Sequence, residues 1–156
     1  MPRLFTAIEL PDEIRDLLYR LHLPLPGARW IARENYHITL RFAGDIDAAS
    51  AREFAQNLAQ IEPDGFDIML KGVGAFGGDD PHSVWAGVEL SPELEALARA
   101  HEKAARAAGL PPENRPLKPH VTRARLKHSI AVAVARYLSR FGGFRAEPFF
   151  VTRTVL

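Results

Sequence analysis

Two kinds of hydrophobic pattern divide the chain into strands and helices of ordinary length. Apolar residues that alternate with polar ones predict strands, which span 3–10, 30–31, 35–42, 66–73, 83–90 and 118–125. Apolar residues spaced three or four positions apart predict helices, which span 11–21, 47–61, 92–108 and 129–141. The final segment, RAEPFFVTRTVL, is predicted to form a further strand.

Several residues support these boundaries. Asp47, Ser91 and Ser129 are predicted to cap the first turns of their helices, because a side-chain oxygen can accept a hydrogen bond from a free backbone N–H. Gly109 is predicted to end the third helix in a left-handed conformation. Within that helix, His101 falls at the spacing of the apolar positions, so we expect it at the boundary of the core. The segment GAFGGDDPH is predicted to be a turn.

The strands around NYHITLRF (35–42) and KPHVTRAR (118–125) each contain a His-x-Thr sequence, and each has a helix before and after it. No low-complexity segment or linker separates the two copies. We therefore predict an α+β fold for residues 1–156, which would form one domain of two pseudo-equivalent lobes.

Alternation along a strand predicts which side chains share a face. The residues expected on the polar faces are His37, Thr39 and Arg41 in the first strand and His120, Thr122 and Ala124 in the second. The residues expected on the core faces are Ile38, Leu40, Phe42 and Val121. If the two strands lie near each other, two imidazoles and two hydroxyls would face one cleft.

That set of side chains suits phosphoryl chemistry without a metal. One neutral imidazole can accept a proton from water, while a charged imidazole can donate one to a leaving oxygen. Threonine hydroxyls and a guanidinium such as that of Arg41 can donate hydrogen bonds to phosphate oxygens. A single His-x-Thr sequence in a strand is more often structural than functional, so this hypothesis depends on the pair.

Composition narrows the class of protein further. Hydrophobic residues make up 47% and charged residues 25% of the 156 positions, as in ordinary globular proteins. A net charge of +1 is too small to indicate nucleic-acid binding from bulk electrostatics. The absence of cysteine excludes disulfides and thiolate metal sites. With no signal-like or membrane-spanning apolar run, we expect a cytoplasmic protein that does not bind membranes. The modest net charge and the lack of a coiled-coil pattern or long hydrophobic stripe favour a monomer.

The motifs and their surroundings resemble the bacterial and archaeal 2′-5′ RNA ligase (LigT-like) family, whose members are RNA 2′,3′-cyclic phosphodiesterases of the 2H phosphoesterase superfamily. The resemblance covers nearly the whole chain and is carried by RLFTAIELP, ENYHITLRFAGD, GVGAFGG, SVWAGVEL and AGLPPENRPLKPHVTRAR. It implies two lobes of antiparallel sheets related by pseudo-twofold symmetry, with helices outside and a central cleft that carries both His-x-Thr motifs. It also implies cofactor-free hydrolysis of 2′,3′-cyclic phosphates on RNA ends or nucleotides to 2′-phosphates, with reversible 2′-5′ RNA ligation in some members.

The resemblance also implies roles for individual residues. His37 would donate the proton to the departing 3′ oxygen, and His120 would be the base that activates water. Thr39 and Thr122 would hold the phosphate. Arg125 matches a family arginine, although strict alternation turns it away from the face of His120.

Aromatic residues near the first motif could supply a surface on which a base stacks. Core packing is the better expectation for Trp30 and Phe42. For Phe5 and Tyr36 the sequence leaves both contact with the ligand and core packing open.

Two features depart from the family pattern. Arg123 stands where an apolar residue is usual, and we expect it to be exposed or paired with an acid. Its replacement by leucine would then spare both activity and melting temperature. Family members also usually continue past VTRTVL with another strand or hairpin. The sequence leaves open whether the chain is a natural short form or lacks that C-terminal strand.

Two alternatives to an RNA 2′,3′-cyclic phosphodiesterase stay open. The same fold could act on 2′-5′ oligonucleotides or ADP-ribose cyclic phosphate. It could also bind RNA or a nucleotide without catalysis, although both histidines and both threonines are present.

Overall fold

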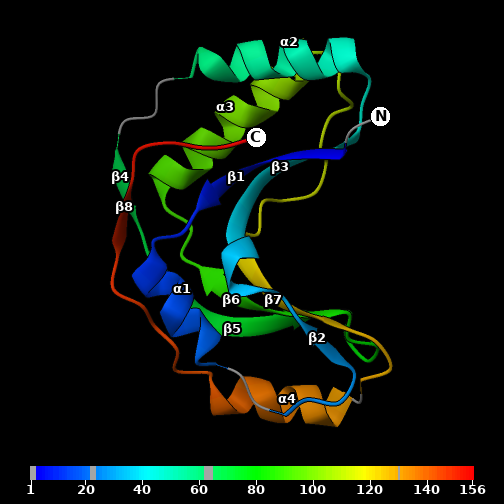
Figure 1. Cartoon of the computed structure of the whole chain (residues 1–156), viewed down its shortest axis with the longest axis vertical. Coiled ribbons are helices and arrows are strands. Elements are labelled where there is room, and N and C mark those ends of the chain that lie inside the picture. The colour runs from blue at the N-terminus through cyan, green and yellow to red at the C-terminus, as the bar shows by residue number, and fades with distance from the viewer. Residues whose placement is uncertain (1–2, 22–23, 62–64, 130) are drawn as a thin grey trace.

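The computed structural model describes residues 3–21, 24–61, 65–129 and 131–156 and confirms the predicted α+β class with antiparallel sheets (Figure 1). The helices are α1 (Asp12–Tyr19), the short 3₁₀ helix η1 (Arg33–Asn35), α2 (Ala48–Ala59), α3 (Pro92–Ala107) and α4 (Ala131–Arg140). The strands are β1 (Arg3–Glu9), β2 (Ala28–Trp30), β3 (His37–Asp45), β4 (Phe66–Ile68), β5 (Leu70–Phe76), β6 (Ser83–Val88), β7 (His120–Leu126) and β8 (Phe149–Val151).

Each His-x-Thr strand belongs to its own sheet. β3 pairs with β1, and β7 is an inner strand of the four-stranded sheet β2-β7-β6-β5. Figure 1 shows α2 and α3 beyond β1 and β3 at one end of the molecule and α4 beside the four-stranded sheet at the other. The small sheet of β4 and β8 lies along the side between them.

One hydrophobic cluster joins the two His-x-Thr strands. Ile38 and Val121, the middle residues of the two motifs, are fully buried and belong to this same cluster. β3 and β7 also contact each other directly. The alternation that buries these two residues turns the histidine and threonine of each motif away from the shared core.

Three helix ends have the capping residues that the sequence predicted. The Oδ1 atom of Asp47 accepts a hydrogen bond from the backbone N–H of Ser50 at 2.7 Å, and the hydroxyl of Ser91 accepts one from that of Leu94 at 3.1 Å. Gly109 follows α3 with φ +90°, the left-handed conformation that glycine adopts without strain. These caps fix where α2 and α3 start and where α3 ends.

The main difference from the predicted strands lies between residues 66 and 76. The segment 66–73 is divided into β4 and β5, because β4 pairs with β8 while β5 pairs with β6 in another sheet. β5 also continues through Phe76, a stretch that its glycines predicted to be a turn. The terminal segment forms β8 as predicted, and Val155 adds a bridge to Ala7 of β1.

His101 provides a test of stability against pH. Its side chain is 1% exposed, its Nδ1 lies 2.9 Å from the hydroxyl of Thr6, and burial lowers its pKa to about 4. The unfolded chain, with an ordinary histidine pKa near ~6.5, takes up this proton first as the pH falls. The resulting stability is therefore complete above that value and is lost as the pH falls toward the folded-state pKa.

We expect His101→Gln, which keeps a group able to bond to Thr6, to remove this part of the acid sensitivity. The free energy of unfolding lost between pH 7.5 and pH 5, measured by urea titration, should be smaller than in the wild type by about 2 kcal/mol. Equal losses in the two proteins would show that His101 is not neutral and buried.

Candidate active site

A β-bulge follows the threonine of the first motif. Thr39 lies opposite Ala7 of β1, but Arg41 lies opposite the next residue along, Thr6, so Leu40 is the extra residue of β3. A bulge of this kind directs both of its residues to one face of the strand. Leu40 and Arg41 are accordingly both buried.

The second motif repeats this arrangement. Thr122 lies opposite Trp85 of β6 and Ala124 lies opposite Val84, so Arg123 is the extra residue of β7. Arg123 and Ala124 are buried together, 1% and 0% exposed. The same irregularity at the same place in both motifs is the most specific sign of their equivalence, and the sequence alone did not indicate it.

The bulges reverse the alternation beyond each threonine and correct two expectations. Phe42, predicted to face the core, is 47% exposed and shares the face of His37 and Thr39 through its pairing with Phe5. Arg125, predicted to alternate away, is exposed on the face of His120 and Thr122.

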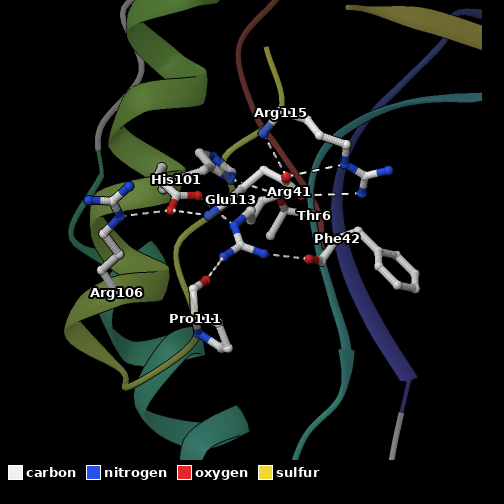
Figure 2. Close-up of polar contacts among 9 residues, drawn as sticks. Thr6, Arg41, Phe42, His101, Arg106, Pro111, Glu113 and Arg115 are labelled. Carbon is white, nitrogen blue, oxygen red and sulfur yellow. Dashed lines mark hydrogen bonds and ion pairs between the residues drawn. The ribbon is translucent and has the colours of Figure 1, made fainter. Parts of the chain in front are cut away.

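The expectation that Arg41 shares the solvent face of His37 is wrong, because the bulge turns its side chain toward α3. Arg41 is 8% exposed, and Figure 2 shows its guanidinium directed to backbone carbonyls at Phe42 and Pro111. Its Nε also bonds to the carboxylate of Glu102 at 2.6 Å. Arg41 therefore ties β3 to α3 and to the proline-rich connector that leads to the second motif.

Glu102 is the centre of that network. Burial alone would raise its pKa, but hydrogen bonds from the backbone N–H of Glu113, from Arg106 and from Arg41 outweigh burial and lower it. Glu102 is therefore ionised at neutral pH and balances the charge of Arg41.

The expectation for Arg123 is also wrong. Arg123 is 1% exposed and, among the residues that the structure describes, has no acidic partner. Its guanidinium donates to the carbonyls of Leu18 and Leu21 and to the hydroxyl of Tyr137, and it lies over the ring of Trp30 at 5.3 Å. The carbonyls lie at the C-terminal end of α1, the negative end of the helix dipole. Arg123 thus joins β7 to α1 from behind the second motif.

Both motif histidines are oriented by the same backbone contact. Nδ1 of His37 lies 2.7 Å from the carbonyl oxygen of Asn35, and Nδ1 of His120 lies 2.7 Å from that of Lys118, in each case two residues earlier. A carbonyl only accepts, so Nδ1 carries the proton in both rings. Nε2 of each ring is therefore the atom that is left for proton transfer.

Aromatic rings flank both imidazoles. Phe5 stacks on His37 with ring centroids 4.8 Å apart, whereas Phe76 meets His120 edge-on at 5.0 Å and Trp85 lies 5.9 Å from it. Phe76 and Trp85 were missed in the sequence because their position depends on the pairing of β5, β6 and β7. The glycine at position 74 was the one sequence feature that could have indicated the position of Trp85. A Cβ on Gly74 would lie 2.3 Å from the Trp85 indole, so only glycine leaves room for that ring.

The structure assigns Tyr36 to the core rather than to a base-stacking surface. Its side chain is 1% exposed and belongs to the cluster that contains Ile38 and Val121. Trp30 packs against a second cluster beneath the four-stranded sheet, as predicted. Phe5, in contrast to Tyr36, lies against a motif histidine.

A pocket of about 390 Å³ opens beside His37. It lies along β1 and the start of β3 and is partly covered by the end of the chain. Its lining includes Phe5, Ala7, Glu9, Asn35, His37 and Val155. Its size and its aromatic side would suit one nucleoside.

In the described segments, histidine and carboxylate side chains do not gather in groups of three that could hold a metal ion. Nor does a helix in the described part of the chain combine the length and apolarity that crossing a bilayer requires.

Known proteins resemble this chain over most of its length. The family model described as LigT like Phosphoesterase matches residues 8–86 and 88–156. A protein of Archaeoglobus fulgidus named RNA 2′,3′-cyclic phosphodiesterase is 30% identical over 99% of this chain and 92% of its own length. A protein of Aeropyrum pernix with the same name is 37% identical, but the match spans 73% of this chain and only 64% of that protein.

Solved structures show the same fold. The crystal structure of Escherichia coli LigT complexed with 3′-AMP superimposes with a TM-score of 0.77 and 28% identity, over 97% of this chain and 84% of that one. The family match extends over both motifs and almost every described element. The chain therefore belongs to the LigT-like phosphoesterase family.

Proposed function

We propose that this protein hydrolyses 2′,3′-cyclic phosphates at RNA ends to 2′-phosphates, with His37 and His120 as its acid and base. The observation that carries the proposal is the repeated construction of the two motifs. In each, a bulge follows the threonine, a backbone carbonyl holds Nδ1 of the histidine, and the imidazole and hydroxyl share one face.

The names of the relatives support the choice of substrate. The Archaeoglobus and Aeropyrum proteins are both named RNA 2′,3′-cyclic phosphodiesterase, and Escherichia coli LigT was crystallised with 3′-AMP. The pocket beside His37 has room for a nucleoside next to the reacting phosphate. Both motifs come from the same chain, and their strands β3 and β7 contact each other.

The reaction transfers two protons. The base takes a proton from water through its free Nε2 while the water oxygen bonds to phosphorus. The bond from phosphorus to the 3′ oxygen breaks, and the charged imidazole donates its Nε2 proton to that oxygen. The products are a 2′-phosphate and a 3′-hydroxyl, with the two histidines in exchanged protonation states. Following the family, we assign the acid to His37 and the base to His120.

The remaining groups stabilise charge on the phosphate. Thr39 and Thr122 lie on the faces of their histidines and donate hydrogen bonds to the non-bridging oxygens, where charge gathers in the transition state. Arg125 is exposed on the same face as Thr122 and adds a positive charge toward the RNA substrate. Phe5 limits the movement of the His37 ring and offers its edge to the nucleoside. With the 5′-hydroxyl of a second RNA in place of water, the same ring opening would form a 2′-5′ linkage and release the 3′-hydroxyl, and the reverse of that reaction would cleave the linkage.

The test is the position of phosphate in the product. The wild-type protein in EDTA should convert 2′,3′-cyclic AMP, and a short RNA with this terminus, to the 2′-phosphate, identified by ³¹P NMR. Faster cleavage of a 2′-5′ dinucleotide or of ADP-ribose cyclic phosphate would move the proposal to another substrate of the family. Binding without turnover of any of them would contradict catalysis.

A further inference from the structure

The four-stranded sheet has one covered face and one open face. On the covered face, Val84 and Ala124 pack against Val134 and Tyr137 of α4. On the open face, the register sets Trp85 opposite Thr122. It is therefore this open face that carries the second motif.

Arginines continue the open face away from the motif. Arg125 lies opposite Arg29, a residue of the edge strand β2, and both side chains are exposed. The neighbours of Arg29 in β2, Ala28 and Trp30, pack against the cluster on the covered face. Alternation therefore directs Arg29 to the same side as His120.

These cations have no acidic partner within the described residues. Seven ion pairs connect other arginines to carboxylates there, but neither Arg29 nor Arg125 takes part in one. Two adjacent like charges that are not balanced repel each other, so a bound anion would stabilise both.

Aromatic side chains lie on the open face across β7 from Arg29, on strands β6 and β5. Trp85 lies over Gly74, Phe76 lies beside it at 5.3 Å, and the ammonium of Lys118 lies 5.4 Å from the Trp85 ring. Aromatic rings with cations beside them are the combination that binds single-stranded nucleic acid, through base stacking and phosphate contacts.

We propose that the open face of the four-stranded sheet binds the RNA strand that leads to the terminal phosphate. A base stacks on Trp85 and Phe76, and a phosphate of a neighbouring nucleotide lies between Arg125 and Arg29. Arg125, with Arg29 opposite it, lies three residues along β7 from Thr122, which is about 10 Å at ~3.3 Å per strand residue. This inference rests on the proposed function and narrows the substrate to oligonucleotides rather than single nucleotides.

The test compares substrates of different length. We take the ratio of kcat/KM for a trinucleotide with a terminal 2′,3′-cyclic phosphate to kcat/KM for 2′,3′-cyclic AMP. Arg29→Gln should lower this ratio about tenfold, because one charge-assisted phosphate contact is lost only with the longer substrate. It should also flatten the dependence of log kcat/KM for the trinucleotide on log salt concentration by about 0.7.

Arg99→Gln is the matched control, because Arg99 is an exposed arginine of α3 and is not part of the four-stranded sheet. It should leave the ratio at its wild-type value. An unchanged ratio in Arg29→Gln, or an equal fall in both variants, would overturn the inference while leaving the proposed function intact.

A binding measurement keeps the inference testable if no substrate is turned over. The probe is a fluorescent trinucleotide that ends in a 2′-phosphate. It has no cyclic phosphate, so it cannot undergo the ring-opening hydrolysis. Its Kd, from fluorescence polarisation, should rise about tenfold in Arg29→Gln and stay constant in Arg99→Gln. Equal Kd values for the wild type and Arg29→Gln would overturn the inference.

Discussion

Replacing either His37 or His120 with alanine is expected to lower kcat/KM for 2′,3′-cyclic AMP by at least about a hundredfold, as measured in EDTA. Loss of a general acid or base typically costs ~100- to 10,000-fold. Because both protons move in one reaction, the double variant should lose much less than the product of the two single losses. The melting temperature should stay close to the wild-type value, since both side chains lie away from the buried cluster.

The matched control is His128→Asn. His128 is an exposed histidine with φ +58°, a conformation that asparagine also tolerates, so this variant should retain full activity. Full activity in His37→Ala or in His120→Ala would show that the two motifs do not act together.

Replacing Arg123 with leucine is expected to destabilise the protein by about 3 kcal/mol, contrary to what the sequence alone suggested. The change removes charged donors from the carbonyls at the end of α1 and from Tyr137, and it removes the cation from the face of Trp30. Relief of the buried charge opposes this loss. We expect the loss to prevail, because leucine is too short to fill the space at the end of α1.

In a chain of this length, a loss of that size corresponds to a fall in melting temperature of roughly 10 °C. Thermal unfolding followed by circular dichroism measures it, with Arg99→Leu as the exposed control, for which we expect almost no change. A melting temperature equal to or above that of the wild type would mean that the desolvation of the Arg123 guanidinium destabilises the fold at least as much as its contacts stabilise it.

The sequence predicted most of the elements because their signals are local. Hydrophobic spacing located the four α-helices, and Asp47, Ser91 and Gly109 marked helix ends with bonds or dihedral angles that the structure contains. The His-x-Thr pairs were found for the same reason: within each motif, histidine and threonine are only two positions apart and precede the bulge.

Features that depend on strand pairing were not predictable. A bulge is defined by the partner strand, so Arg41 and Phe42 were placed on the wrong faces and Arg125 was turned away from its motif. The burial of Arg123 depends on carbonyls more than a hundred residues earlier in the chain. Trp85 reaches His120 only through the register of β6 with β7.

The pairing of the two histidines in one reaction is tested most directly by the pH dependence of kcat/KM for 2′,3′-cyclic AMP. If one imidazole must be neutral and the other charged, the wild type gives a bell-shaped profile. Our assignment predicts that the residual activity of His120→Ala loses the acidic limb, and that of His37→Ala loses the alkaline limb. A wild-type profile without two limbs, or one left unchanged in both variants, would contradict an active site built from the two motifs.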